Sequence, residues 1–210
     1  MWRVQVERKE GQAGDWRSQW AGCERMVGLY VPYVLVRCAA YTDGRRQAQQ
    51  IGVYTLVSAC LVAREVGPAV PAGRIVEITL RVVGPDVRAG ARGEDWRQGP
   101  DEPLLADPWM QYMATALNAL KRPGREVLVL HYVGGRTAED LARLLGQGPQ
   151  EVRARLGRAE RRLARWLGGA QVRPALARFT AGLDRHWMAE VAAGALEYLA
   201  GNADLAIGFG

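Results

Sequence analysis

The sequence predicts an all-α protein built from two small helical domains. Apolar residues recur at one-turn spacing along most of the chain, and a stretch rich in glycine, proline and charge divides it near the middle. The chain has 210 residues, of which 49% are hydrophobic and 24% charged, the composition of an ordinary globular protein. We expect a first helical domain at 1–85, a linker at 86–106, a second helical domain at 107–170 and a C-terminal helical extension at 171–210.

A helical hairpin is expected in the first domain. Residues 1–20 hold three tryptophans without a clear period, and we interpret them as an arm or a short first element. Helical spacing begins near Glu24, Thr42-Asp43-Gly44 marks a turn, and a second helix is expected from about Arg46 to Arg64. The start of that second segment, 51–57, also has the composition of a strand.

The end of the first domain has a weaker pattern. Residues 74–83 favour a strand by composition or a short helix by context, and Gly84-Pro85 is expected to end this element. The stretch from Val87 to Pro103 is rich in glycine, proline and charge, which indicates a linker.

The second domain begins with a clear helix signal, because Asp107-Pro108 places an N-cap residue before a proline at the first helical position. This helix keeps one apolar stripe as far as Leu120. Residues 121–124 are expected to form a turn, followed by a short apolar helix over 125–133 that ends at Gly134-Gly135.

A helix-turn-helix pattern follows. Thr137 to Asp140 has capping-box character and starts a helix over 137–145, Gly146-Gln147-Gly148 forms a tight turn, and a second helix spans 149–166. The apolar face of that second helix is Val152, Leu156, Ala159, Leu163, Trp166 and Leu167. Its opposite face holds Arg153, Arg155, Arg158, Arg161, Arg162 and Arg165. Arginine hydrogen-bonds guanine or neutralises phosphate, so this face is either a nucleic-acid site or a solvated surface.

Positive charge gathers in the same part of the chain. Residues 121–178 hold 13 Lys or Arg and 5 Asp or Glu, an excess of +8, whereas the whole chain has a net charge of +6. Basic charge concentrated in one segment is typical of a polyanion site.

The tail after the basic segment is expected to form one helix from Pro174 to Leu199, and the last ten residues are expected to fray. Three roles stay open for this tail: a regulatory helix, a dimer face, or a helix that packs on the core.

The helix-turn-helix segment resembles region 4 of extracytoplasmic-function (group 4) RNA polymerase sigma factors. The matching motifs are Ala116-Leu-Asn-Ala-Leu120, Arg125-Glu-Val-Leu-Val-Leu-His-Tyr-Val133, Gly134 to Gly146, and Glu151 to Leu163 with its Arg-Leu-x-Arg-Ala run. The resemblance implies that the second helix docks in the major groove of a −35 promoter element. Residues expected near the bases are Gln150, Arg153 and Ala154, and those expected near phosphates are Arg155, Arg158 and Arg162. Arg136 and Thr137 are further candidates for phosphate contacts, although Thr137 also suits capping its own helix.

The first domain resembles region 2 of the same family through Leu29-Tyr30-x-x-Tyr33, Arg37 and Asp43-Gly44. The resemblance implies that core RNA polymerase binds the next helix, at the positions Gln49, Gln50, Val53 and Tyr54. Glutamines stand there in place of the family's acids, and Gly84-Pro85 is expected to break the segment that would read the −10 element. The alternative is therefore a sigma-derived regulator or interaction module that neither binds core polymerase nor opens promoters. An anti-sigma or other regulatory protein is a further possible partner.

Other function classes find little support. The sequence has no glycine-rich phosphate loop, no nucleophile elbow and no carboxylate–histidine cluster, so we expect no enzyme, no catalytic residue and no cofactor. Cys23, Cys38 and Cys60 follow no metal spacing and are expected to be buried, and with only His131 and His186 a metal site is not expected. The start of the chain lacks a signal-peptide core and no apolar run is long enough to span a bilayer, which predicts a cytoplasmic protein without membrane contact.

Overall fold

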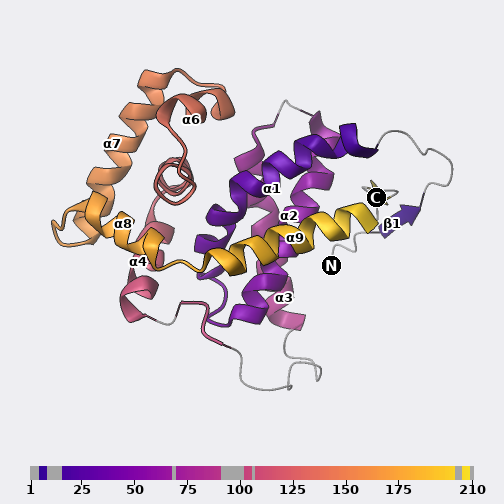
Figure 1. The fold of residues 1–210 in the computed structure, drawn as a ribbon, viewed down its shortest axis with the longest axis horizontal. Coiled ribbons are helices and arrows are strands. Elements are labelled where there is room, and N and C mark those ends of the chain that lie inside the picture. Colours follow the sequence, from indigo (N-terminus) through magenta and orange to yellow (C-terminus); the bar gives the residue numbers. More distant parts are fainter. Residues whose placement is uncertain are drawn as a thin grey trace.

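The computed structural model describes residues 5–8, 16–67, 70–90, 102–105, 107–201 and 205–208, and the side chains within 22–67, 70–85, 102–105 and 107–201. These parts of the chain are almost entirely helical, which confirms the predicted all-α class (Figure 1). The helices are α1 Trp16–Cys38, α2 Arg45–Val66, α3 Ala72–Gly90, α4 Pro108–Ala119, α5 Arg122–Leu128, the π-helical turn η3 Val129–Val133, α6 Ala138–Leu145, α7 Pro149–Trp166, α8 Val172–Ala181 and α9 Arg185–Gly201. A two-stranded antiparallel sheet pairs β1 Gln5–Arg8 with β2 Leu205–Gly208.

The predicted hairpin of α1 and α2 is confirmed, and the segment with strand-like composition is helical. It buries Ile51, Leu56 and Val57 against neighbouring helices, so tertiary packing overrides the β-propensity of these residues. The structure places helix from Trp16 onward and a strand at 5–8, where the sequence indicated only an arm or a short element.

The expectation that Gly84-Pro85 ends its element is wrong. α3 continues through both residues to Gly90, and it is a helix rather than a strand. Gly84 lies against the ring of Tyr41, and a Cβ atom at this position would come within 2.9 Å of that ring. Proline removes one backbone hydrogen bond, but burial of the α3 face that holds Val76 and Leu80 compensates for it.

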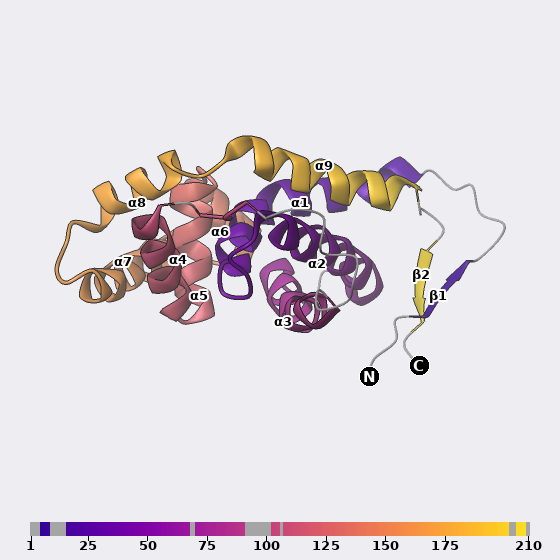
Figure 2. The same cartoon turned by 90° about the horizontal axis from the view of Figure 1, so that it is seen from below.

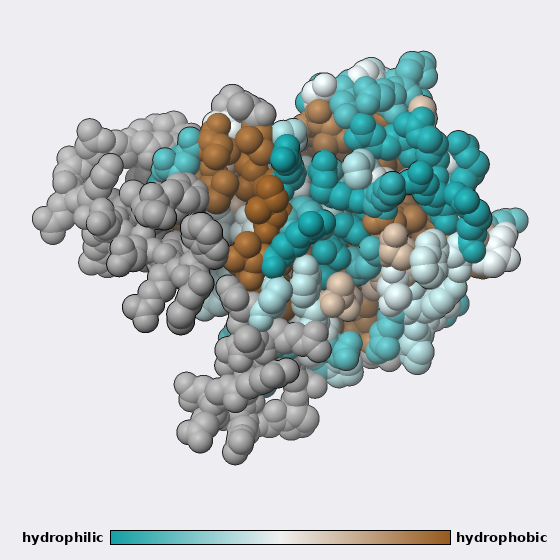
Figure 3. All heavy atoms as spheres, turned by 180° about the vertical axis from the view of Figure 1, so that it is seen from behind, coloured by the Kyte–Doolittle hydropathy of each residue, from teal (hydrophilic) through white to brown (hydrophobic). Residues whose placement is uncertain are grey.

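Hydrophobic surface nevertheless remains outside the core of the first half. α3 exposes Ile78 and Val82, which lie one turn apart, at 53% and 52% of their surface. On the face opposite to that of Figure 1, hydrophobic surface gathers in a band (Figure 3). The core therefore takes up only one side of α3.

The second half begins as predicted at α4, where the carboxylate of Asp107 accepts a hydrogen bond of 2.8 Å from the amide of Trp109. The turn expected at 121–124 is wrong, because α5 already begins at Arg122. Pro123 falls in the first turn of α5, where its missing N–H group leaves no hydrogen bond unmade.

The helix-turn-helix is confirmed at α6 and α7. Gly146 ends α6 with a φ of 61°, the left-handed conformation that favours glycine, and Gly148 precedes the first residue of α7. The predicted apolar face is buried at Val152, Leu156, Ala159 and Leu163. The prediction that Trp166 belongs to this buried face is wrong, since 52% of its surface is exposed. It is the last residue of α7, and its carbonyl accepts a hydrogen bond from the hydroxyl of Tyr112.

The tail is two helices rather than one, which corrects the expectation of a single helix. α8 ends at Ala181, and Asp184 starts α9 by accepting a hydrogen bond of 3.0 Å from the amide of Trp187. α8 packs on η3 and α7, whereas α9 lies along α1 and α2 (Figure 2). The end of the chain, expected to fray, includes strand β2.

The two halves share one hydrophobic core, which α8 and α9 extend from the helix-turn-helix to α1 and α2. α3 occupies residues 86–90 of the segment expected to be a linker, and the end of that segment, 102–104, lies beside the start of α2. There the amide of Arg45 donates to the carbonyl of Glu102 and the amide of Leu104 donates to the carbonyl of Asp43, each over 2.7 Å. The division into four segments stays a prediction.

Candidate nucleic-acid interface

The outer face of α7 presents the side chains that the sequence predicted for DNA. Those of Gln150, Arg153, Ala154, Arg158 and Arg162 are exposed, and that of Arg155 is half-buried. Arg136 and Thr137 are also exposed, just before the start of α6. Because the opposite face of α7 is buried, the helix can offer this side to a groove without losing its packing.

Carboxylates hold two of these arginines. Arg153 pairs with Glu139 of α6, and Arg155 pairs with Glu151 one turn earlier at 3.0 Å. Arg158, Arg161 and Arg162 form no ion pair within the described part of the chain. The middle of α7 therefore carries uncompensated positive charge, while the arginines of its first turns are oriented by acids.

Thr137 acts as a cap. Its hydroxyl oxygen accepts a hydrogen bond of 3.0 Å from the amide of Asp140, whose carboxylate accepts from the Thr137 amide at 3.2 Å. The hydrogen bonds from the Thr137 side chain and backbone hold the pKa of Asp140 below its usual range. The expected capping box, with Asp in place of Glu, is thus confirmed.

Contacts behind α7 fix its position. The hydroxyl of Tyr132 in η3 donates to Glu160 at 2.5 Å, and the hydroxyl of Thr180 in α8 donates to the carbonyl of Tyr132 at 3.3 Å. Burial and the neighbouring Glu160 carboxylate raise the pKa of Tyr132 to about 12, so the phenol stays a donor. The C-terminal extension thereby supports the same helix that presents the arginines.

The residues predicted to meet polymerase do not share one open surface. Gln50 and Tyr54 lie one turn apart on α2 and are exposed, whereas Gln49 and Val53 are half-buried. α9 covers part of this helix, since a Cβ atom on Gly194 would lie 3.4 Å from Val53.

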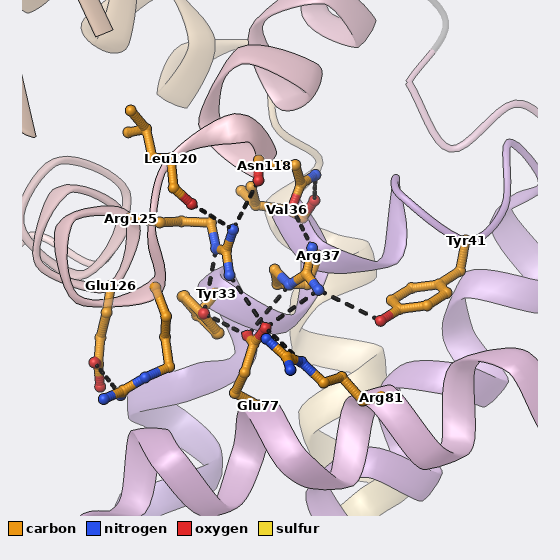
Figure 4. Close-up of polar contacts among 11 residues, drawn as sticks. Tyr33, Val36, Arg37, Tyr41, Glu77, Arg81, Asn118, Leu120, Arg125 and Glu126 are labelled. Atoms are coloured by element: carbon orange, nitrogen blue, oxygen red, sulfur yellow. Dashed lines mark hydrogen bonds and ion pairs between the residues drawn. The ribbon is translucent and has the colours of Figure 1, made fainter. Parts of the chain in front are cut away.

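A buried polar cluster, which the sequence did not predict, joins the two halves (Figure 4). Glu77 of α3 pairs with Arg37 of α1 at 3.3 Å and with Arg125 of α5 at 3.2 Å, and it accepts a 2.6 Å hydrogen bond from the hydroxyl of Tyr33. Arg37 also donates to Asn118 of α4 at 2.7 Å. The signal available in the sequence was the presence of charged residues within largely apolar stretches, but the pairing itself depends on the tertiary fold.

The two buried glutamates of this region differ in charge preference. Burial alone would raise the pKa of Glu77, but the hydrogen bond from Tyr33 and the guanidinium groups of Arg37 and Arg125 hold it below its usual range. Burial raises the pKa of Glu126, against the opposing effect of Arg122. Glu77 is thus the carboxylate that stays charged between the halves.

The geometry of α6 and α7 defines the class of this part of the chain: it is a helix-turn-helix domain with a basic outer face. The family described as sigma-70, region 4 matches residues 110–163, which supports a sigma-70 region 4 domain in this part of the chain. Region 4 is a DNA-binding transcription-factor domain rather than an enzyme, and it implies interaction with DNA and RNA polymerase. The chain matches no curated protein and no solved structure.

Two features are absent from the described residues. Among these residues no helix is both long and apolar enough to cross a bilayer. Nor do they bring together three or more His, Cys, Asp or Glu side chains in a group able to hold a metal ion.

Proposed function

We propose that this protein is a sigma factor of the extracytoplasmic-function type that directs transcription initiation by placing α7 in the major groove of a −35-type promoter element. The observation that carries the proposal is the exposed arginine face of α7 within a region 4 domain. A helix with one buried apolar face and one exposed basic face is the form that a recognition helix takes.

The proposed contacts follow position along α7. Gln150, Arg153 and Ala154 lie in its first turns and would face base edges, while Arg155, Arg158 and Arg162 would neutralise phosphates. The free amides at the start of α7 add a favourable site for a phosphate. Arg136 and Thr137, which lie just before the start of α6, would approach the phosphate backbone of the DNA.

The proposed DNA contact is tested by removing charge from α7. The ligand is a DNA duplex selected from a random pool for binding to the wild type. We expect the double variant Arg158→Ala, Arg162→Ala to bind this duplex more than about tenfold more weakly at low salt. Its affinity should also depend less steeply on salt concentration. These two arginines have no ion-pair partner among the described residues, so their loss leaves no carboxylate unpaired. Fluorescence anisotropy measures both quantities.

The control for this test is Arg185→Ala, which removes an exposed charge from the start of α9. It should leave the affinity unchanged. Equal affinity of the α7 double variant and the wild type would refute the assignment of the recognition helix.

Core RNA polymerase is the second proposed partner, through Gln49, Gln50, Val53 and Tyr54 of α2. The alternative function, a sigma-derived regulator that does not bind core polymerase, is favoured by α9, which packs over part of this helix. An anti-sigma or other regulatory protein is proposed as a partner for either form.

Size-exclusion chromatography with core polymerase from the source organism, followed by promoter-dependent transcription, separates the two functions. A complex that makes transcript supports the sigma factor. DNA binding without polymerase binding supports the regulator.

A further inference from the structure

A cleft of about 410 Å³ lies among α1, α2 and α3, and α6 adds Leu144 to its wall. Its wall includes Cys23 and Met26 of α1, Cys60 and Arg64 of α2, Ile75 of α3 and Leu144 of α6. The cleft is apolar except for two thiols and one guanidinium group. Nothing in the proposed DNA or polymerase contacts uses these side chains.

The two cysteines of the cleft are neighbours in space. Cys23 and Cys60 are both free, and they come from helices that lie side by side in Figure 1. The thiol of Cys60 donates to the backbone carbonyl of Cys23 over 3.9 Å, and both side chains line the same cleft. The third cysteine, Cys38, lies outside the cleft, and its thiol donates to the carbonyl of Ala48 at 3.6 Å.

The environment makes the two thiols unequal. The neighbouring Cys60 thiol lowers the pKa of Cys23 against the effect of burial, and the charge of Arg64 lowers it further. The neighbouring Cys23 side chain, together with burial, raises the pKa of Cys60. Cys23 is therefore the thiol that ionises first, beside a protonated neighbour. Burial raises the pKa of Cys38 to about 12, which keeps that thiol inert.

We propose that Cys23 and Cys60 form a peroxide-oxidised dithiol site that closes to a disulfide between α1 and α2. The Cys23 thiolate attacks one oxygen of hydrogen peroxide, so that an S–O bond forms, the O–O bond breaks and, with one proton taken up, water leaves. The Cys60 sulfur then attacks the sulfur of the Cys23 sulfenic acid. An S–S bond forms, the S–O bond breaks, and the thiol proton leaves with the hydroxyl as a second water. A dithiol reductant reverses the change.

The cleft suits this chemistry because it admits molecules of the size of water, and peroxide is scarcely larger. Cys23 is 6% exposed and Cys60 is fully buried, which matches an attacking thiol at the wall and a resolving thiol behind it. The disulfide would close the loop from 23 to 60 and so raise the melting temperature of the oxidised protein.

The test uses the full-length wild type treated with a small excess of hydrogen peroxide. We expect two of the three thiols to be lost in a denaturing thiol titration, a mass decrease of about 2 Da, and a peptide that links Cys23 to Cys60 in non-reducing digestion. Dithiothreitol should restore all three. If the three thiols persist, or the link involves Cys38 or a second chain, the proposal is wrong.

Serine variants assign the roles, with far-UV circular dichroism to check that each one folds. Cys38→Ser is the matched control and should still form the disulfide. Cys60→Ser should stop at a Cys23 sulfenic acid that dimedone traps, whereas Cys23→Ser should yield neither adduct nor disulfide. A dimedone adduct on Cys60 in the Cys23→Ser variant would reverse the assignment and overturn the proposal. The wild-type peptide map decides the existence of the site even if a variant does not fold.

Discussion

At the scale of single residues, Glu77 is the carboxylate of the buried polar cluster. It lies 3% exposed between two buried arginines, and its two oxygens are shared among Arg37, Arg125, the hydroxyl of Tyr33 and the more exposed Arg81. Buried charges are tolerated only when they are paired, so this carboxylate is what allows Arg37 and Arg125 to enter the core.

Glu77→Gln should lower the free energy of unfolding by about 3 kcal/mol, because two buried guanidinium groups lose their counter-charge while the shape of the side chain is kept. Urea denaturation followed by circular dichroism measures the change. Glu197→Gln, the same substitution at an exposed position of α9, is the control and should change stability by less than about 0.5 kcal/mol. A similar loss in both variants would mean that the cluster adds nothing specific.

The stability difference between the wild type and Glu77→Gln should depend on pH. The pKa of Glu77 is lowered on folding, so its contribution to stability is complete above its unfolded pKa of about 4.3. That contribution is lost as pH falls through the folded value. The difference in unfolding free energy between the wild type and Glu77→Gln should therefore be constant from pH 7 to 5 and shrink below about pH 4. A difference that grows on acidification would contradict the assignment of Glu77 as the charged partner.

At the scale of elements, glycine has different structural roles in α3 and in α7. Gly84 of α3 faces the Tyr41 ring at a distance that leaves no room for a Cβ atom. Gly157 of α7 has only the end of the Arg161 side chain nearby, 3.5 Å from a Cβ built there. The first glycine serves helix packing, and the second only lowers helix propensity.

Alanine at these two positions should therefore act in opposite directions. Gly157→Ala should stabilise the protein by up to about 1 kcal/mol through helix propensity. Gly84→Ala should destabilise it by about 1–3 kcal/mol, because Tyr41 must shift. Thermal unfolding of both variants measures the two signs, and stabilisation by both would show that α3 does not pack as described.

At the scale of the whole molecule, α9 connects the helix-turn-helix half to α1 and α2 (Figure 2). Its buried side chains recur every four residues, at Trp187, Val191, Ala195 and Leu199. Gly52 of α2 lets it approach closely, since a Cβ atom there would lie 2.9 Å from Val191. Arg45 adds ion pairs to Asp184 at 2.7 Å and to Glu190 at 4.0 Å.

Arg45→Glu should loosen α9, because the new carboxylate faces Asp184, Glu190 and Glu102 where the arginine was paired with all three. We expect amide hydrogen exchange in α9 to accelerate on the order of tenfold, while exchange in α7 stays unchanged. If the variant also binds core polymerase more tightly than the wild type, α9 restricts access to the α2 surface. Unchanged amide exchange in α9 would show that the ion pairs of Arg45 do not hold this helix in place.

Much of the candidate site could be predicted from the sequence because its signals are local. The Thr137–Asp140 cap, the left-handed Gly146 and the period of the apolar face determine where α6 and α7 begin, end and expose their arginines. The pairing of Arg153 with Glu139 could not be predicted, because it depends on how α6 docks against α7.

By itself, the sequence determined the all-α class, the hairpin of α1 and α2, and the helix-turn-helix with its basic face. Only the tertiary structure decided that α3 runs through Gly84-Pro85, that the tail divides into α8 and α9, and that Glu77 stays charged in the core. The physical reason is the separation along the chain over which each interaction acts. Caps, turns and helical periods act over a few residues, whereas burial and charge pairing depend on segments that meet only when the chain has folded.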